Sequence, residues 1–139
     1  VLRSNIIFSY SDRTKASFVN WVVESLKNRK LITVVNDQWN NPTWTNDLAN
    51  VISMIIDKDI VGLYHYGGKD FMNRFEFAKM IALAFGLDQT LIEPIATTEL
   101  NWLAQRPLKS GLYTNKIELD LGIEALPIKK ALDKMVSLL

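Results

Sequence analysis

Short runs of β-branched and apolar residues alternate along this chain with longer segments in which apolar residues recur at helical spacing. The runs occupy residues 2–9, 31–36, 62–66 and 92–96. Strands separated by helices are typical of α/β proteins, in which helices cover the faces of a sheet. The alternation is incomplete for a full doubly wound sheet. The sequence therefore predicts the last strand or strands of one sheet, followed by a small α/β lobe.

The segments between these runs carry helix start and stop signals. Thr45 or Asn46 can cap one helix, with Asp47 in its first turn. Asn73 and Glu76 are three residues apart, as in a capping box. The predicted helices run from Thr14 to about Arg29, from Thr45 or Asn46 through Ile56, from Asn73 to Gly86, from Thr97 to Gln105, from Thr114 to Gly122 and from Pro127 to Leu139.

Length and composition indicate one ordinary globular domain. The chain has 139 residues, of which 48% are hydrophobic and 22% charged, with a mean hydropathy of +0.04. Sixteen basic and fifteen acidic residues are scattered along it, which argues against nucleic acid as a partner. Cysteine is absent and His65 is the only histidine, so a zinc site is not expected.

The first residues have neither the basic segment nor the long apolar segment of an export signal. Together with the absence of cysteine, this favours a cytoplasmic protein without a membrane partner. The chain begins without methionine, inside a predicted strand. We therefore expect that it is part of a longer protein.

Residues 36–49, NDQWNNPTWTNDLA, contain two tryptophans, four asparagines and a proline between a predicted strand and a predicted helix. Aromatic and amide groups on one loop suit a ligand with flat and hydroxylated parts. The alternative is that Trp39 and Trp44 pack beneath the loop as satellite core residues, which is the commoner fate of large rings.

Arg106 precedes a proline in a loop that follows the predicted short helix carrying Trp102. The planar guanidinium is well matched to a phosphate or pyrophosphate group, although a solvated loop arginine is an equally good interpretation of the local sequence. His65 lies in a predicted strand without an acidic residue two or four positions away, which favours a structural role. The six glycines match neither a dinucleotide-binding nor a Walker spacing.

Four collinear segments give the chain a family resemblance. VVNDQWNNPTWTNDLA resembles the V-x-N-D-Q-x-G-x-P-T segment of dTDP-4-dehydrorhamnose reductases, and RPLKSGLYTNKIELDLGI resembles their R-P-x-x-S-x-L-x-x-x-K segment. VLRSNIIF is similar to their strand L-R-T-S-W-V-Y, and GLYHYGG followed by FEFAKMI is similar to their next strand and helix. The order and spacing agree over nearly the whole chain.

The resemblance implies the C-terminal part of an extended short-chain dehydrogenase/reductase. Residues 1–36 would include the end of the Rossmann sheet, and residues 37–139 would form the lobe that binds the nucleotide sugar. The parent enzyme would use NADPH or NADH to reduce a 4-keto nucleotide sugar, most simply a dTDP-sugar, in dTDP-L-rhamnose and cell-surface polysaccharide biosynthesis. The glycine-rich cofactor loop and the Tyr-x-x-x-Lys pair of the family would lie in a preceding Rossmann half, so this chain should not catalyse the reaction alone.

By the same resemblance, Arg106 is the candidate for the pyrophosphate, and Gln38, Pro42 and Thr43 belong to the loop that lines the nucleotide-sugar cleft. The neighbours Trp39, Asn41 and Trp44 complete the predicted substrate-binding set. No catalytic, cofactor-binding or metal-binding residue is expected in this chain.

Two positions depart from the family pattern. Ile6 stands where the family often has a tryptophan near the sugar, which leaves the identity of the sugar open. Asn40 stands where the family usually has glycine, and Asn tolerates the left-handed backbone for which glycine is used.

Two other functions are compatible with these residues. One is a non-catalytic regulatory relative of the same fold that binds a partner protein, as the regulatory subunit of methionine adenosyltransferase does. The other is an epimerase or reductase of a different nucleotide sugar. Without the preceding Rossmann half, we expect an unpaired strand edge in residues 2–9 and an uncovered apolar face, which would lead the chain to self-associate.

Overall fold

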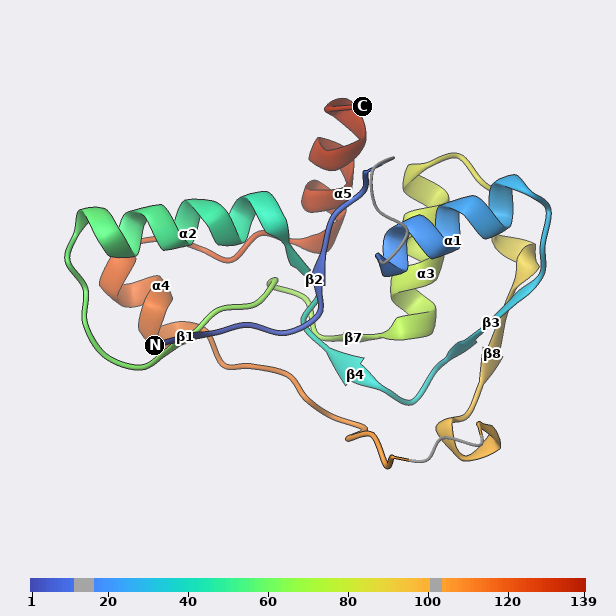
Figure 1. Cartoon of the computed structure of the whole chain (residues 1–139), viewed down its shortest axis with the longest axis horizontal. Helices are drawn as coiled ribbons and strands as arrows, with labels where there is room; N and C mark the ends of the chain where they lie inside the picture. Colours follow the sequence, from blue (N-terminus) through green and yellow to red (C-terminus); the bar gives the residue numbers. More distant parts are fainter. Residues whose placement is uncertain (12–16, 101–103) are drawn as a thin grey trace.

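Pairs of short strands, set between helices, organise the α/β structure (Figure 1). The computed structural model describes residues 1–11, 17–100 and 104–139. Three pairs are parallel and join segments far apart in the chain. They are β1 (Leu2–Arg3) with β6 (Tyr64–His65), β2 (Ile7–Phe8) with β5 (Thr43–Trp44) and β3 (Ile32–Val35) with β8 (Ile92–Ile95); β4 (Trp39–Asn40) is antiparallel to β7 (Met72–Asn73).

The expected single strand over residues 2–9 is wrong. The backbone bends between β1 and β2 at Ile6, whose φ is 41°, a value in the left-handed region that β-branched residues rarely adopt. The Ile6 carbonyl accepts a hydrogen bond from the Thr43 N–H at 3.0 Å, which holds the bend. As a result, β1 pairs with β6, whereas β2 changes partner and pairs with β5.

Five α-helices and two short 3-10 helices are present in the described residues, and their positions agree broadly with the sequence prediction. At α3, the Asn73 side chain accepts the Glu76 N–H at 2.8 Å, which confirms the predicted cap. Gly122 ends α4 with a φ of 69°. The helices are α1 (Phe18–Lys27), α2 (Thr45–Asp57), α3 (Arg74–Ala84), η1 (Gln89–Leu91), η2 (Thr97–Glu99), α4 (Asn115–Leu121) and α5 (Ile128–Ser137).

Some predicted caps differ from the structure. Trp44 precedes α2 without a side-chain cap bond, so neither Thr45 nor Asn46 is the cap, although Asp47 lies in the first turn as expected. Thr97 is the first residue of η2 rather than its cap. Predicted helical residues 14–16 and 101–103, which include Trp102, lie outside the described residues.

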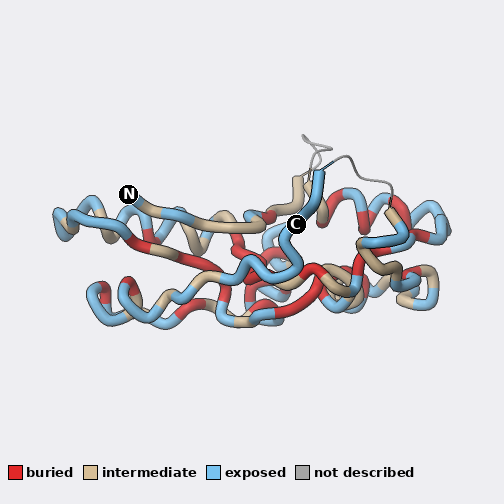
Figure 2. Tube along the Cα trace, turned by 90° about the horizontal axis from the view of Figure 1, so that it is seen from below, coloured by how far each residue is buried: buried red, intermediate tan, exposed pale blue. Residues whose placement is uncertain are grey.

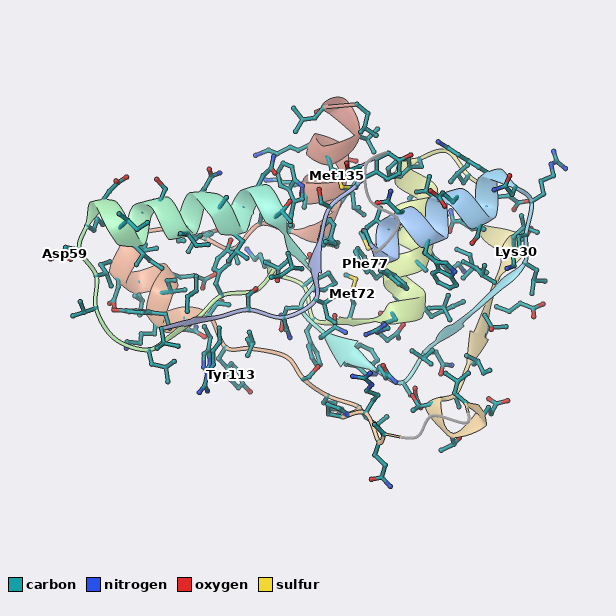
Figure 3. The ribbon with its side chains drawn as sticks, viewed as in Figure 1. Lys30, Asp59, Met72, Phe77, Tyr113 and Met135 are labelled. Atoms are coloured by element: carbon teal, nitrogen blue, oxygen red, sulfur yellow. The ribbon has the colours of Figure 1, made fainter. Side chains whose placement is uncertain are left out.

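Two clusters of buried side chains form the interior of this elongated, flattened molecule (Figure 2). The large core lies among α1, α3, α5, β3 and β8, and Figure 3 labels its members Met72, Phe77 and Met135. The small core lies among α2, β6 and α4 and consists of Val51, Tyr64, Tyr66, Ile117, Leu121 and Ala125. The loop of residues 36–44 connects β3 of the large core to α2 of the small core.

The longest of the described helices is α2, with 13 residues. None of the described helices has both the length and the apolar character that a bilayer crossing requires.

Candidate functional site

The loop of residues 36–44 is built around β4, which has neighbours on both edges. On one edge it pairs with β7. On the other edge the Trp39 N–H donates to the Leu108 carbonyl at 2.7 Å, and the Ser110 N–H donates to the Trp39 carbonyl at 2.9 Å. This arrangement brings together three segments, residues 39–40, 72–73 and 108–110. About 30 residues or more separate each segment from the next in the sequence.

The last part of the loop is buried and anchors it to its neighbours. The Thr43 hydroxyl, fully buried, lies 2.9 Å from the Asn5 carbonyl oxygen and 3.0 Å from that of Asn41. Pro42 is also buried, and its carbonyl oxygen would lie only 2.0 Å from a Cβ at position 68, so that position requires glycine. Trp44 belongs to the large core, which agrees with the packing interpretation of this ring.

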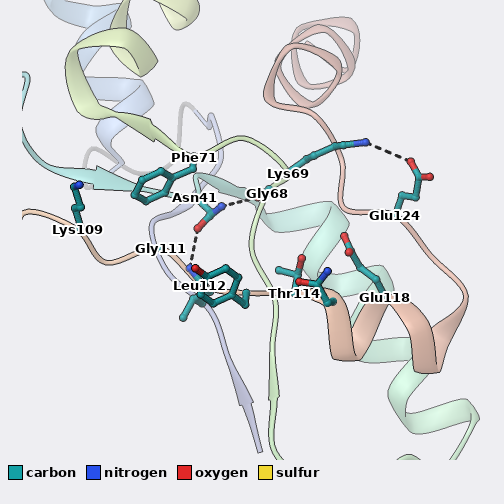
Figure 4. Close-up of a pocket in the computed structure, with 12 residues that line it drawn as sticks. Asn41, Gly68, Lys69, Phe71, Lys109, Gly111, Leu112, Thr114, Glu118 and Glu124 are labelled. Atoms are coloured by element: carbon teal, nitrogen blue, oxygen red, sulfur yellow. Dashed lines mark hydrogen bonds and ion pairs between the residues drawn. The ribbon is translucent and has the colours of Figure 1, made fainter.

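Asn41 connects the loop to a cavity of about 730 Å³ (Figure 4). Its side-chain amide donates to the Gly68 carbonyl at 3.1 Å, and its side-chain oxygen accepts the Leu112 N–H at 2.8 Å. The exposed rings of Phe71 and Tyr113 line the same cavity. Its charged lining consists of Lys69, Lys109, Glu118 and Glu124, of which Lys69 and Glu124 form an ion pair at 3.5 Å.

Trp39 lies at the border of this cavity. Its ring is partly buried, and its centroid is 5.7 Å from that of Phe71, which lines the cavity. Residue 39 is also bridged to Lys109, another lining residue. Trp39 therefore supports the cavity wall, whereas Trp44 supports the core.

Gln38 is held by a short chain of polar contacts. Its buried amide donates to the Thr97 hydroxyl at 3.0 Å. That hydroxyl donates to one Asp37 carboxylate oxygen at 2.6 Å, and the Thr97 N–H donates to the other at 3.0 Å. The hydrogen bond from the Thr97 side chain is the main cause that lowers the pKa of Asp37. These contacts join the start of the loop to η2.

Arg106 is exposed and lies two residues before Leu108, on the segment that borders β4. Arg74 lies on the other side of the strand, where its N–H donates to the Gln38 carbonyl at 3.2 Å. Burial lowers the pKa of Arg74, and the positive charge of Arg106 lowers it further. The Arg74 backbone thus contacts Gln38, and the charge of Arg106 acts on the Arg74 side chain.

Sequence reasoning did not single out Arg74, Thr97 or Phe71. A signal for Arg74 was present, because the Asn73 cap puts a cation in the first turn of a helix, where acidic residues are favoured. No comparable signal exists for Thr97 and Phe71, whose contacts depend on long-range pairing. Asn40 lies in β4 and has no positive φ, and the left-handed conformation occurs at Ile6 instead.

His65 lies outside this loop, in the pair of strands β1 and β6. It ends β6 beside Arg3 of β1. Its Nε2 is buried and has no hydrogen-bond partner in the part of the chain that the structure describes.

The fold and the loop define the class of protein: an α/β region that matches the C-terminal part of extended short-chain dehydrogenase/reductase structures. The structure is similar to that of dTDP-4-dehydrorhamnose reductase from Bacillus anthracis str. Ames in complex with NADP, with a TM-score of 0.88 and 27% identity. That likeness covers 99% of this chain and 48% of the other.

The family follows from the sequence match. The model of the RmlD substrate binding domain matches residues 1–139, and the chain belongs to this family. It is 32% identical over 127 residues to dTDP-4-dehydrorhamnose reductase of Aggregatibacter actinomycetemcomitans, covering 84% of this chain and 43% of the relative. It is 30% identical over 139 residues to methionine adenosyltransferase 2 subunit beta of Danio rerio, covering 95% and 43%. The chain thus spans less than half the length of these relatives.

Proposed function

We propose that this chain forms the nucleotide-sugar-binding part of an NADPH-dependent reductase that acts on a dTDP-linked 4-keto sugar. The proposal is supported by the RmlD substrate binding domain match over residues 1–139 and by the reductase names of its relatives. We also propose dTDP-L-rhamnose and cell-surface polysaccharide biosynthesis as its setting. The boundary at residue 36, between the end of the Rossmann sheet and the binding lobe, belongs to the same proposal.

The arrangement of the loop supports this proposal: β4 and its two neighbours hold the chain segments that contain Gln38, Asn41 and Arg106 side by side. In the proposed complex, Arg106 binds a diphosphate oxygen through a charge-assisted hydrogen bond. Gln38, Asn41 and Trp39 line the cleft beside it. Pro42, Thr43 and Trp44 form the wall from within, because all three are buried.

The nicotinamide cofactor does not fit the residues of this chain. Its six glycines do not form the family's cofactor loop, and no tyrosine is followed four positions later by lysine. We therefore derive no hydride or proton transfer from these residues. Their proposed part in the reaction is to bind and orient the sugar nucleotide against a Rossmann half, which we propose as the partner of this lobe.

Replacing Arg106 by Ala tests the proposal. We expect the dissociation constant for a dTDP-sugar to rise about 10- to 100-fold, corresponding to the loss of a charge-assisted hydrogen bond of about 1.5–3 kcal/mol. Isothermal calorimetry on the protein in its full natural length measures this. Lys30→Ala is the matched control, since Lys30 is exposed in the segment that follows α1 (Figure 3). Equal affinity of the Arg106 variant and the wild type would contradict the proposed role.

The identity of the nucleotide is tested separately. Parallel titrations with dTDP-sugars and UDP-sugars should show tighter binding of the dTDP compounds. Tighter binding of UDP-sugars would support an epimerase or reductase of another nucleotide sugar instead.

A regulatory subunit is the second candidate function, because methionine adenosyltransferase 2 subunit beta is among the relatives that match nearly the whole chain. Here the same lobe would belong to a non-catalytic subunit that binds another enzyme. Reduction of a 4-keto nucleotide sugar by the full-length protein would contradict this candidate. Co-purification of the protein with a methionine adenosyltransferase, without reductase activity, would support it.

A further inference from the structure

The segment of residues 108–112 forms part of the cavity wall and follows Arg106 closely in the chain, yet it belongs to no helix and to none of the eight strands. Within the described part of the chain, its backbone pairs only with Trp39, through one parallel bridge at Lys109. A single bridge specifies the register of two segments weakly, because other peptide groups of a shifted segment would offer the same two hydrogen bonds. Other contacts must therefore fix the register of this segment.

Two asparagine side chains bond to the backbone of the 108–112 segment. The Asn5 side-chain amide donates to the Ser110 carbonyl. The Asn41 side-chain oxygen accepts the Leu112 N–H at 2.8 Å (Figure 4). Asn5 lies between β1 and β2, and Asn41 lies between β4 and β5, so the two bonds reach the segment from separate parts of the fold. Both bonds form together in one register only.

The orientation of the Asn41 amide is itself fixed. Its nitrogen donates to the Gly68 carbonyl at 3.1 Å, while its oxygen accepts the Leu112 N–H. If the amide were turned over, its oxygen would face a carbonyl oxygen and its NH₂ group would face an N–H. Asn41 is buried, so these mismatches could not be relieved by bulk water. The side chain therefore recognises one backbone position on each side.

Gly111 specifies the same register by packing. A Cβ at this position would lie 2.6 Å from the Phe71 ring and 3.0 Å from the Asn41 side-chain oxygen. The residues on either side, Ser110 and Leu112, both carry side chains. A shift of the segment by one residue in either direction would place a side chain in this space, where it would collide with the ring. Hydrogen bonding and packing thus select the same register independently.

We infer that Asn5 and Asn41 are positioning residues of the candidate site, because they fix the register of the 108–112 segment on β4. Arg106 lies two residues before this segment, so the register determines where its side chain begins. The part of the inference that concerns the ligand rests on the proposed function. A segment that is ordered in advance binds its ligand more tightly, because the entropy cost of ordering it is not incurred on binding.

The test uses the protein in its full natural length, titrated with dTDP by calorimetry at a temperature where circular dichroism shows each variant to be folded. We expect Asn5→Ala and Asn41→Ala each to raise the dissociation constant about 10-fold. Asn20→Ala is the matched control, because Asn20 is also buried and donates to a backbone carbonyl, that of Ser11, at 2.7 Å. It should lower stability comparably and leave the affinity for dTDP unchanged.

A double variant separates positioning from direct contact with the ligand. If Asn41 acts through Arg106, adding Asn41→Ala to Arg106→Ala should raise the dissociation constant by less than about 2-fold. A full additional loss of about 10-fold would show that Asn41 binds the ligand independently of Arg106, and this would overturn its positioning role.

Hydrogen exchange tests the register without any ligand. The Ser110 N–H bonds to the Trp39 carbonyl and not to either asparagine, so its protection reports on the bridge itself. We expect this amide to exchange about 10-fold faster in Asn5→Ala and in Asn41→Ala, and at the wild-type rate in Asn20→Ala.

Each other outcome has a distinct meaning. Unchanged exchange at Ser110 in both variants overturns the inference, whatever the ligand does. Faster exchange without binding of dTDP or dTDP-sugars by the wild type supports the role in register and contradicts the proposed function. Binding of dTDP by the wild type with unchanged affinity in Asn5→Ala and Asn41→Ala overturns the inference and leaves the proposed function intact.

Discussion

The helices α1 and α2 both have an apolar stripe, yet they differ greatly in burial. α1 buries six of its ten residues against the large core. α2 has 13 residues and buries only Val51, while Ile52 and Ile56 remain exposed. Apolar periodicity therefore predicts that a helix forms. It does not predict how many of the apolar side chains on that helix are buried by the rest of the chain.

The two cores also differ in chemistry. None of the buried hydrophobic side chains of the large core is ionisable. The small core includes two tyrosines whose hydroxyls bond to carboxylates, Tyr64 to Asp120 at 2.8 Å and Tyr66 to Asp47. Its stability thus depends on a few polar contacts in addition to packing, and it should respond to pH in a way that the large core does not.

The strongest test of this difference is truncation of Phe77. This side chain is 1% exposed and packs between Phe8 and Phe18, with ring centroids at 5.1 and 5.6 Å. We expect Phe77→Ala to lower the free energy of unfolding by about 3–5 kcal/mol. Val51→Ala in the small core should cost only about 1–2 kcal/mol. Urea unfolding followed by circular dichroism measures both, and equal losses would remove the distinction between the cores.

A medium effect is expected from Tyr66→Phe. The substitution removes the donor to Asp47 and should cost about 1–3 kcal/mol in the free energy of unfolding. Burial, reinforced by the Asp47 hydrogen bond, raises the pKa of Tyr66 far above its ordinary value of 10.0.

The raised pKa of Tyr66 determines the direction in which the free energy of unfolding changes with pH. Above about pH 10 the unfolded tyrosine loses its proton while the folded one keeps it, so stability is full below that pH and falls as the pH rises further. The fall should be smaller in Tyr66→Phe. Tyr113→Phe is the control, because Tyr113 is 91% exposed. Identical alkaline unfolding profiles for wild type and Tyr66→Phe would refute this account.

The smallest effect is expected from Ile56→Lys on α2. Ile56 is 70% exposed, so the free energy of unfolding should change by less than about 0.5 kcal/mol. Val22→Lys on α1 places a charge at a fully buried position and should prevent stable folding.

If exposed apolar side chains of α2 promote self-association, light scattering on Ile56→Lys should show a smaller mean mass than on the wild type. A large loss of stability in Ile56→Lys would mean that α2 is more covered than the structure indicates.

Sequence patterns were reliable where local interactions decide the structure. The Asn73 cap, the Gly122 stop and the β-branched runs of β3 and β8 are local features, and all were predicted. The split of residues 2–9 was not, because the bend at Ile6 is held by a hydrogen bond from Thr43, which lies 37 positions further along the chain. β4 and β5 were also missed, since strands of two residues exist only through partners elsewhere in the chain.

The same distinction between local and long-range interactions applies to the residues of the candidate site. Arg106 and Gln38 were predicted from residue type and family resemblance, and their roles toward a ligand stay predictions. Arg74 could not be placed beside them from sequence, because their meeting depends on the antiparallel pairing of β4 with β7. The cavity near Asn41 likewise depends on Phe71 and Leu112, which lie 30 and 71 positions away in sequence.

The parallel pair of β3 and β8 joins residues that are 60 positions apart, such as Ile32 and Ile92. Between these strands the chain leaves the large core, builds α2 and β6 of the small core, and returns to form α3. No single cut can therefore separate the two cores into independent pieces. Closing so long a loop costs chain entropy before the pairing is gained, so folding of the two cores should be cooperative and limited by this late long-range closure.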